Sequence, residues 1–177
     1  AAQDTLTVTE PVIRPVCTTL TAKIATIASG IGEADETKLD TERIQNAIDQ
    51  CGKGKAVALQ PDGAMNAFLS GPIQLREGVT LLVQKGATLY ASRDPKLYET
   101  SPGSCGIVAK ARNGCKPLIS VSHVSGAGVM GDGTIDGRGG SKLLGQNVTW
   151  WNLAEQARAP GIGGQQMFAA SGDEILH

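Results

Sequence analysis

The residues best suited to acid–base chemistry are Asp132 and Asp136, which lie in the segment Gly-Asp-Gly-Thr-Ile-Asp-Gly at 131–137. Two carboxylates that flank a glycosidic bond can hydrolyse it, and carboxylates also bind calcium. With Thr-Ile between them in a strand, their Cα atoms would be about 13 Å apart, which is long for a hydrolytic pair. The EF-hand pattern is not met either. We therefore expect each side chain to cap its own turn.

The same segment contains the spacing Gly126-x-Gly128-x-x-Gly131, which matches the fingerprint of a dinucleotide-binding loop. That loop must open a helix whose N-terminus binds the pyrophosphate. The sequence that follows, Asp-Gly-Thr-Ile-Asp-Gly, is not helical. We interpret the glycines as corners of the chain and predict no cofactor site.

Other candidate residues are isolated. The histidines, His123 and His177, have no nearby nucleophile with an orienting partner, and we expect His123 to be an outward polar residue on a strand. The pair Trp150-Trp151 could stack on a sugar, but we favour the interpretation that it fills a gap under a loop. Asn147-Val148-Thr149 is a glycosylation sequon, which has meaning only in a eukaryotic source.

Composition narrows the class of protein. The net charge is −1, and the chain has two Phe, two Tyr and two Trp, so neither an electrostatic footprint nor a stacking platform for nucleic acid is present. No apolar run approaches the roughly 18–20 residues of a membrane span. The opening Ala1-Ala2-Gln3 resembles a mature terminus after signal removal. We predict no metal site and no nucleic-acid or membrane partner.

The cysteines indicate the compartment. They stand at 17, 51, 105 and 115, with no C-x-x-C pair that would suggest zinc or redox chemistry. Cys105 and Cys115 bracket a short loop with an Asn-Gly turn, and Cys17 could pin an N-terminal arm to the end of a helix at Cys51. We predict disulfides 17–51 and 105–115 in a secreted protein. The alternative is four buried thiols in a cytosolic domain.

The pattern of elements predicts a solenoid. One amphipathic helix is expected at Thr41–Cys51, with Asp40 as N-cap and Gly52 as its stop. It would cover the first layer of a stacked core. Residues 1–22 read as an extended arm and 23–39 as a loop or short strand. Short strands then recur at 56–60, 67–70, 73–75, 79–83 and 87–91, a pattern that returns after roughly 20–25 residues and favours stacked coils over a sandwich.

The second half continues the pattern with interruptions. Residues 92–117 read as an excursion, and short apolar runs at 118–121, 129–130 and 134–135 resume the coils. Residues 141–159 suggest a short helix or loop with both tryptophans, and 160–177 show no strand pattern. We predict one domain, 1–177, that is all-β: a right-handed parallel β-helix with a short capping helix at about 41–51.

These segments resemble a known family. V-A-L-Q-P-D-G, S-G-P-I-Q-L and V-T-L-L-V-Q-K-G-A-T-L-Y-A-S resemble the opening coils of the pectin-lyase-like β-helix. Cys105-Gly106 with Gly114-Cys115-Lys116-Pro117-Leu118-Ile119, then G-D-G-T-I-D-G-R-G and Trp150-Trp151, are similar to the N-terminal part of a polygalacturonase of glycoside hydrolase family 28. The resemblance covers about residues 30–158, and the chain departs from the family pattern after about 160.

The resemblance implies a secreted hydrolase that cuts α-1,4-galacturonan in pectin with inversion, one Asp acting as general acid and others activating water. The family carries these groups in Asn-Thr-Asp, Asp-Asp, Gly-His-Gly and Arg-x-Lys motifs. None of these motifs occurs in this sequence, and the acidic pair Asp173-Glu174 matches none of them. We therefore assign no catalytic residue in this chain, and whether it is itself an enzyme stays open.

Three interpretations remain. The chain represents the N-terminal portion of a polygalacturonase whose catalytic coils lie elsewhere, or a truncated non-catalytic homologue that binds polysaccharide or a partner chain. A different β-helix enzyme, such as a pectate lyase, is the weakest, because no acidic calcium cluster is evident. An open last coil invites strand pairing. We expect it to be covered by residues 160–177, a second copy or a second fragment.

Overall fold

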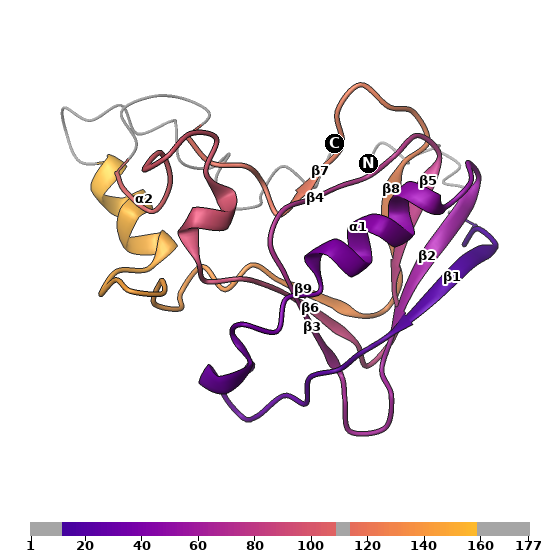
Figure 1. Ribbon diagram of the computed structural model, residues 1–177, viewed down its shortest axis with the longest axis horizontal. Helices are drawn as coiled ribbons and strands as arrows, with labels where there is room; N and C mark the ends of the chain where they lie inside the picture. Colours follow the sequence, from indigo (N-terminus) through magenta and orange to yellow (C-terminus); the bar gives the residue numbers. More distant parts are fainter. Residues whose placement is uncertain (1–11, 109–113, 159–177) are drawn as a thin grey trace, which may run out of the picture.

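Three parallel sheets wind around one apolar core in this computed structural model, which describes residues 12–108 and 114–158. The first sheet has the order β1-β2-β5-β8, the second β3-β6-β9 and the third β4-β7 (Figure 1). Successive strands of one turn of the chain therefore belong to different sheets, and each strand pairs with its counterpart in the next turn. The predicted fold class, an all-β parallel β-helix, is confirmed. Its expected right-handed winding agrees with the hand of nearly all parallel crossovers.

The strand bounds follow the predicted segments closely. The strands are β1 Val16–Thr21, β2 Lys55–Gln60, β3 Ala67–Ser70, β4 Ile73–Gln74, β5 Val79–Val83, β6 Thr88–Ala91, β7 Ile119–Ser120, β8 Gly128–Met130 and β9 Thr134–Asp136. β1, in the predicted N-terminal arm, is one edge strand of the first sheet, and β8 is the other. The predictions for residues 160–177, including His177 and Asp173-Glu174, lie outside the described residues.

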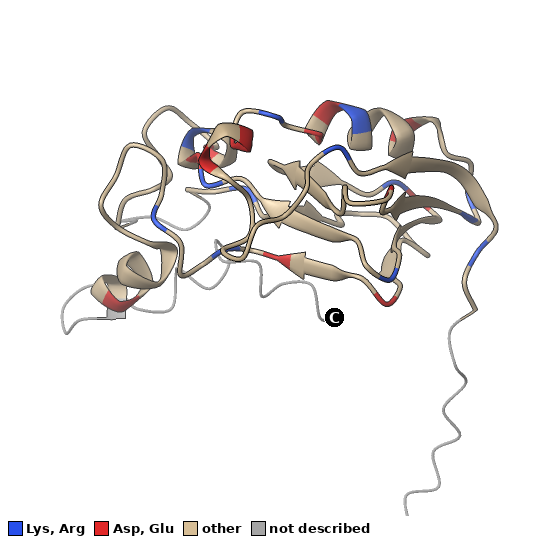
Figure 2. Cartoon of the chain, turned by 90° about the horizontal axis from the view of Figure 1, so that it is seen from below, with Lys and Arg blue, Asp and Glu red and all other residues tan. Residues whose placement is uncertain are grey.

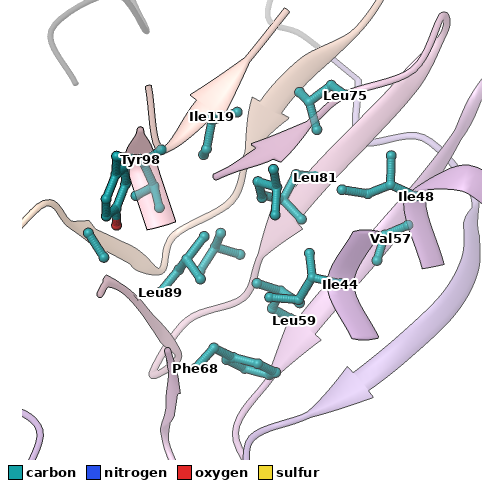
Figure 3. Close-up of a cluster of buried hydrophobic side chains, with 14 of the residues drawn as sticks. Ile44, Ile48, Val57, Leu59, Phe68, Leu75, Leu81, Leu89, Tyr98 and Ile119 are labelled. Atoms are coloured by element: carbon teal, nitrogen blue, oxygen red, sulfur yellow. The ribbon is translucent and has the colours of Figure 1, made fainter. Parts of the chain in front are cut away.

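The register between neighbouring strands aligns apolar side chains of successive turns in columns. Val57 pairs with Leu81 and Leu81 with Val129, so three inward side chains stack across β2, β5 and β8. In the second sheet, Phe68, Leu89 and Ile135 form a parallel column. Except for the two last-coil residues, these side chains are completely or almost completely buried (Figure 3). Each buried side chain of this size contributes roughly 1.5–3 kcal/mol relative to exposure.

A column of glycines marks the corner that precedes the first sheet. Gly54, Gly78 and Gly126 have φ values of 76°, 69° and 65°, which side chains rarely adopt. Gly54 N donates to Gly78 O over 2.8 Å, and Gly78 N donates to Ser125 O over 2.9 Å. The same left-handed corner therefore recurs in each turn.

The predicted capping helix is present as α1, Thr41–Gln50. Ile44 and Ile48 are fully buried against the first turn of the β-helix (Figure 3). Figure 2 shows α1 lying across one end of the stacked strands. The helix ends one residue earlier than predicted, because Cys51 has an extended backbone and pairs with Cys17. Gly52 adopts no left-handed conformation, so it does not end the helix as predicted.

The N-cap prediction is correct in position and wrong in contact. Asp40 precedes the helix, but its carboxylate makes no hydrogen bond to a helix N–H. Its Oδ1 instead accepts from Arg43 Nε and Nη2, at 2.9 and 2.6 Å. Arg43 Nη1 also donates to Thr21 O over 2.9 Å. The nearby guanidinium, tied to β1, attracts the carboxylate more strongly than a neutral amide does.

Three segments lie outside the coils. Between β6 and β7 the chain makes the predicted excursion, with a short 3₁₀ helix, η2, at Pro95–Tyr98. Between β1 and α1, where a loop or short strand was predicted, a 3₁₀ turn, η1, forms at Glu33–Asp35. After β9 the chain forms α2, Trp150–Arg158, at the side of the coils (Figure 1).

Candidate functional site

The aspartates of the 131–137 segment do not form a reactive pair. Both are exposed. Asp136 Oδ1 accepts a hydrogen bond from Arg138 N over 2.8 Å, so this side chain caps its own turn as predicted. Asp132 lies at the corner between β8 and β9. In the described part of the chain, no group of three or more His, Cys, Asp or Glu residues could hold a metal ion.

The glycine motif is structural, and its members differ. Gly126 and Gly131 are corners with positive φ, 65° and 114°. A Cβ on Gly131 would overlap the backbone of Val83 in β5, so this corner stacks directly on the turn before it. Gly128 lies in strand β8, and a Cβ there would meet nothing within 4 Å. The interpretation of all three as corners is therefore wrong for Gly128.

His123 is exposed, as predicted, but the strand prediction is wrong. It lies in the bend between β7 and β8 with a φ of 55°. Left-handed conformations are unusual for residues other than Gly, although His is enriched among the exceptions. β7 ends at Ser120, three residues before His123.

The four cysteines form two disulfides between the residues expected to pair, Cys17–Cys51 and Cys105–Cys115. The first joins β1 to the end of α1. The second closes the excursion, whose segments are also joined by a hydrogen bond from Lys116 N to Tyr98 O over 2.6 Å.

A buried ionic cluster, which the sequence interpretation missed, joins three parts of the chain. Glu36 accepts hydrogen bonds from Arg93 Nε, over 2.9 Å, and from Arg138 Nη1, over 3.1 Å, and it also contacts Arg138 Nη2. The side chains are 3%, 11% and 8% exposed. Arg93 Nη2 also binds Glu33, which is largely exposed. We call Glu36, Arg93 and Arg138 the Glu36 cluster.

The contacts of the Glu36 cluster indicate a structural role. Every charged oxygen of Glu36 has a guanidinium partner, and Arg138 also donates to Ala91 O over 3.3 Å and lies over the ring of Tyr90. The partners are 57 and 102 residues from Glu36, so no local sequence pattern could indicate them.

The two tryptophans have different surroundings, and the interpretation that both fill a gap is wrong. Trp150 is 9% exposed and packs edge-to-face with Tyr98, with ring centroids 6.1 Å apart. Trp151 is 66% exposed. Neighbouring residues on a helix point about 100° apart, so the pair cannot share one environment.

The sequon has a structural use in this fold. Asn147 is exposed, whereas Thr149 caps α2. Asn152 N donates to Thr149 Oγ1 over 3.0 Å, and Thr149 N donates to Asn152 Oδ1 over 3.0 Å. This reciprocal pair is a capping box with Asn in place of Glu or Gln.

Among the residues that the structure describes, two titratable groups have a pKa that departs from its ordinary value. Burial raises the pKa of Tyr98, whose hydroxyl donates to Ser92 O over 3.1 Å. The hydrogen bond from Arg76 lowers the pKa of Asp49, which is exposed on α1. Neither residue lines the groove between α1 and β4. A shallow groove of about 640 Å³ runs between α1, β4 and residues 116–120, but its lining is mainly apolar and amide-bearing.

Within the described ranges, no helix is long and apolar enough to cross a membrane.

No profile of a known protein family matches the chain. Individual proteins do. The chain is 41% identical over 157 residues to an endo-polygalacturonase of Pectobacterium carotovorum subsp. carotovorum, covering 89% of this chain and 36% of that protein. It is 39% identical over 165 residues to a polygalacturonase of Ralstonia solanacearum, covering 88% and 31%.

A solved structure has a similar fold and a similar sequence. The polygalacturonase from Erwinia carotovora ssp. carotovora superposes with a TM-score of 0.73 at 41% identity, over 88% of this chain and 38% of that one. The resemblance seen in the sequence motifs is thus confirmed, and the chain spans about a third of the length of the proteins it matches.

Proposed function

We propose that this chain, homologous to polygalacturonases over most of its length, provides the capped opening coils of a pectin-degrading glycoside hydrolase. The substrate would be α-1,4-linked galacturonan, and the protein would act outside the cell. The observation that carries the proposal is the agreement of sequence and fold with polygalacturonases, at 41% identity and a TM-score of 0.73. The two disulfides support an oxidising compartment.

The catalytic groups are proposed to lie in coils outside this chain. Hydrolysis requires two carboxyl groups that converge on one glycosidic bond. The exposed Asp132 and the turn-capping Asp136 do not converge, and the buried carboxylate Glu36 is held between two guanidiniums. These opening coils, 1–177 taken as one domain, would provide the base on which the catalytic coils stack.

The edge of the last coil offers the attachment point. Among the described residues, β8 and β9 each pair with one strand only. Their inward side chains Val129 and Ile135 contact the core but are only partly buried, whereas those of β5 are buried throughout. An uncovered parallel edge with apolar side chains pairs readily with another strand. We propose that a further coil of a polygalacturonase β-helix occupies it.

The test is complementation. The 177-residue chain would be co-expressed with the part of the Pectobacterium enzyme to which it does not correspond, and reducing ends released from polygalacturonate would be measured. The chain alone should release none, and the co-purified pair should release them. Turnover by the chain alone would overturn the placement of the catalytic groups, and a folded pair that never hydrolyses polygalacturonate would overturn the function.

A matched pair of variants tests the edge. Ile135→Asp puts a charge on the inward side of β9 and should abolish co-purification. Val121→Asp changes a residue that is 52% exposed between β7 and β8 and should leave it intact. Equal behaviour of the two variants, with circular dichroism showing both folded, would argue against pairing at this edge.

A further inference from the structure

The indole of Trp151 lies across two glycines. Built on Gly139, a Cβ would overlap atoms of the five-membered ring, and built on Gly140 it would lie 2.7–3.1 Å from Cζ3, Cε3 and Cη2 of the six-membered ring. Each ring therefore contacts the backbone of one glycine. Any larger residue at either position would displace the indole.

The backbone also fixes this arrangement. Trp151 N donates to Gly139 O over 3.1 Å, and the capping box of Thr149 and Asn152 holds the first turn of α2. One face of the indole is covered by the glycine backbone, yet the side chain remains 66% exposed. The result is a tryptophan with little freedom to move and a ring surface open to solvent.

Burial does not account for this residue. Trp150, on the adjacent helix position, already provides the aromatic contact with the core. A tryptophan contributes most of its hydrophobic stabilisation when it is buried, and two glycines in succession carry an entropic cost on folding. A flat, rigid and exposed aromatic ring is the arrangement that binds a ligand without further ordering of the protein.

We propose that Trp151 is a stacking site for a pyranose ring of galacturonan, an inference that rests on the proposed function. One face of a galacto-configured ring presents the hydrogens of C3, C4 and C5 as an apolar patch with slight positive charge. That patch complements the negative face of an indole. Trp151 would bind the polysaccharide away from the glycosidic bond that is cut. Its contribution would be to the affinity for the substrate.

The surroundings favour a sugar over a protein surface. The neighbours of Trp151 on the helix surface are Ala154, which is half-buried, and Glu155, which is exposed, and the adjacent Asn152 is exposed and polar. Protein interfaces are centred on contiguous apolar patches, whereas sugar sites combine one aromatic face with hydrogen-bonding groups. Lys142, exposed and bridged through its backbone to Thr149, adds a positive charge beside the start of α2.

The test uses binding by the 177-residue chain, so that it is independent of hydrolysis. In native gels cast with polygalacturonate, the chain should be retarded, and Trp151→Ala should weaken the apparent affinity about tenfold, with Trp151→Phe in between. Tetragalacturonate should quench the tryptophan fluorescence of the chain but not that of Trp151→Ala. Unchanged retardation in Trp151→Ala, or no quenching in the original chain, would overturn the proposal.

Two glycine variants test whether the backbone beneath the indole matters for binding. Gly140→Ala retains the tryptophan but displaces its six-membered ring, and it should reduce binding nearly as much as Trp151→Ala. Gly137→Ala, where a Cβ meets nothing within 4 Å, should not reduce it. Equal binding by the two glycine variants would contradict the assigned geometry. The two proposals can be told apart. Weaker binding of polygalacturonate by Trp151→Ala and Gly140→Ala, together with no hydrolysis by the complemented pair, would support the stacking site and overturn the proposed function.

Discussion

The side-chain amide of Gln45 in α1 forms two hydrogen bonds with the backbone of Gln74 in β4, as a neighbouring strand would. Gln74 N donates to Gln45 Oε1 over 2.8 Å, and Gln45 Nε2 donates to Gln74 O over 3.1 Å. One turn earlier, Gly71 N donates to Thr41 Oγ1 over 2.8 Å. The capping helix therefore covers apolar side chains with Ile44 and Ile48 and also satisfies the backbone at the open edge of the third sheet.

Gln45→Ala should lower the free energy of unfolding by about 1–2 kcal/mol, because two backbone groups of Gln74 lose their partners. Urea unfolding followed by circular dichroism measures the effect. Asn46→Ala, at the next and exposed position of α1, is the matched control and should change stability by less than about 0.5 kcal/mol. Equal losses in both variants would contradict edge capping by Gln45, since Ala has the higher helix propensity at both positions.

Gly131→Ala should be among the most destabilising single changes in the chain. It combines a φ of 114° with overlap against the backbone of Val83, and we expect a loss of about 2–4 kcal/mol or failure to fold. Thermal unfolding and soluble yield measure it. Gly128→Ala changes a glycine of the same motif that has open space around it, and a change within about 0.5 kcal/mol is expected. A comparable loss at both positions would contradict the stacked-corner explanation.

Local patterns predicted the coils well because each strand is specified by its own residues. β3 and β5 have the predicted bounds, since apolar runs such as Val79–Val83 end at glycine corners. The stripe of Ile44 and Ile48 likewise specified α1. The carboxylate of Asp40 was misassigned because its contact depends on Arg43 and on the position of β1, which no cap rule includes.

The candidate site at Trp151 was less predictable, because its surroundings also depend on residues from other elements. The pattern Trp-Trp contains nothing that separates a buried ring from an exposed one. The difference arises from Tyr98 on one side and from Gly139-Gly140 on the other. The glycines could have indicated a flat contact with an aromatic ring, but only if α2 had been placed beside them.

Glu36→Gln should lower the free energy of unfolding by about 3–5 kcal/mol, because the buried guanidinium of Arg138 then lacks a charged partner and that of Arg93 keeps only the exposed Glu33. Chemical denaturation at pH 7 measures the loss. Glu33→Gln is the matched control: Glu33 contacts the same Arg93 but is 82% exposed, so a change below about 1 kcal/mol is expected. A small effect at Glu36 would mean that the cluster is not a principal attachment between the N-terminal loop and the coils.

Tyr98 should make the protein sensitive to alkali. Burial raises the pKa of its phenol above the ordinary value of 10.0, so the folded state keeps a proton that the unfolded chain releases above about pH 10. The contribution is complete below that pH and is lost as the pH rises further, by up to about 1.4 kcal/mol per pH unit for this one group.

Tyr98→Phe should therefore cost about 1 kcal/mol at pH 7, where the hydrogen bond to Ser92 O is lost, yet show a shallower fall in stability between pH 10 and pH 11.5. Urea midpoints across pH 7–11.5 for both proteins measure the two effects together. Because the variant lacks the titrating group and keeps the aromatic contact with Trp150, the curves should converge in alkali. Parallel curves over the whole range would show that the Tyr98 proton is not linked to folding.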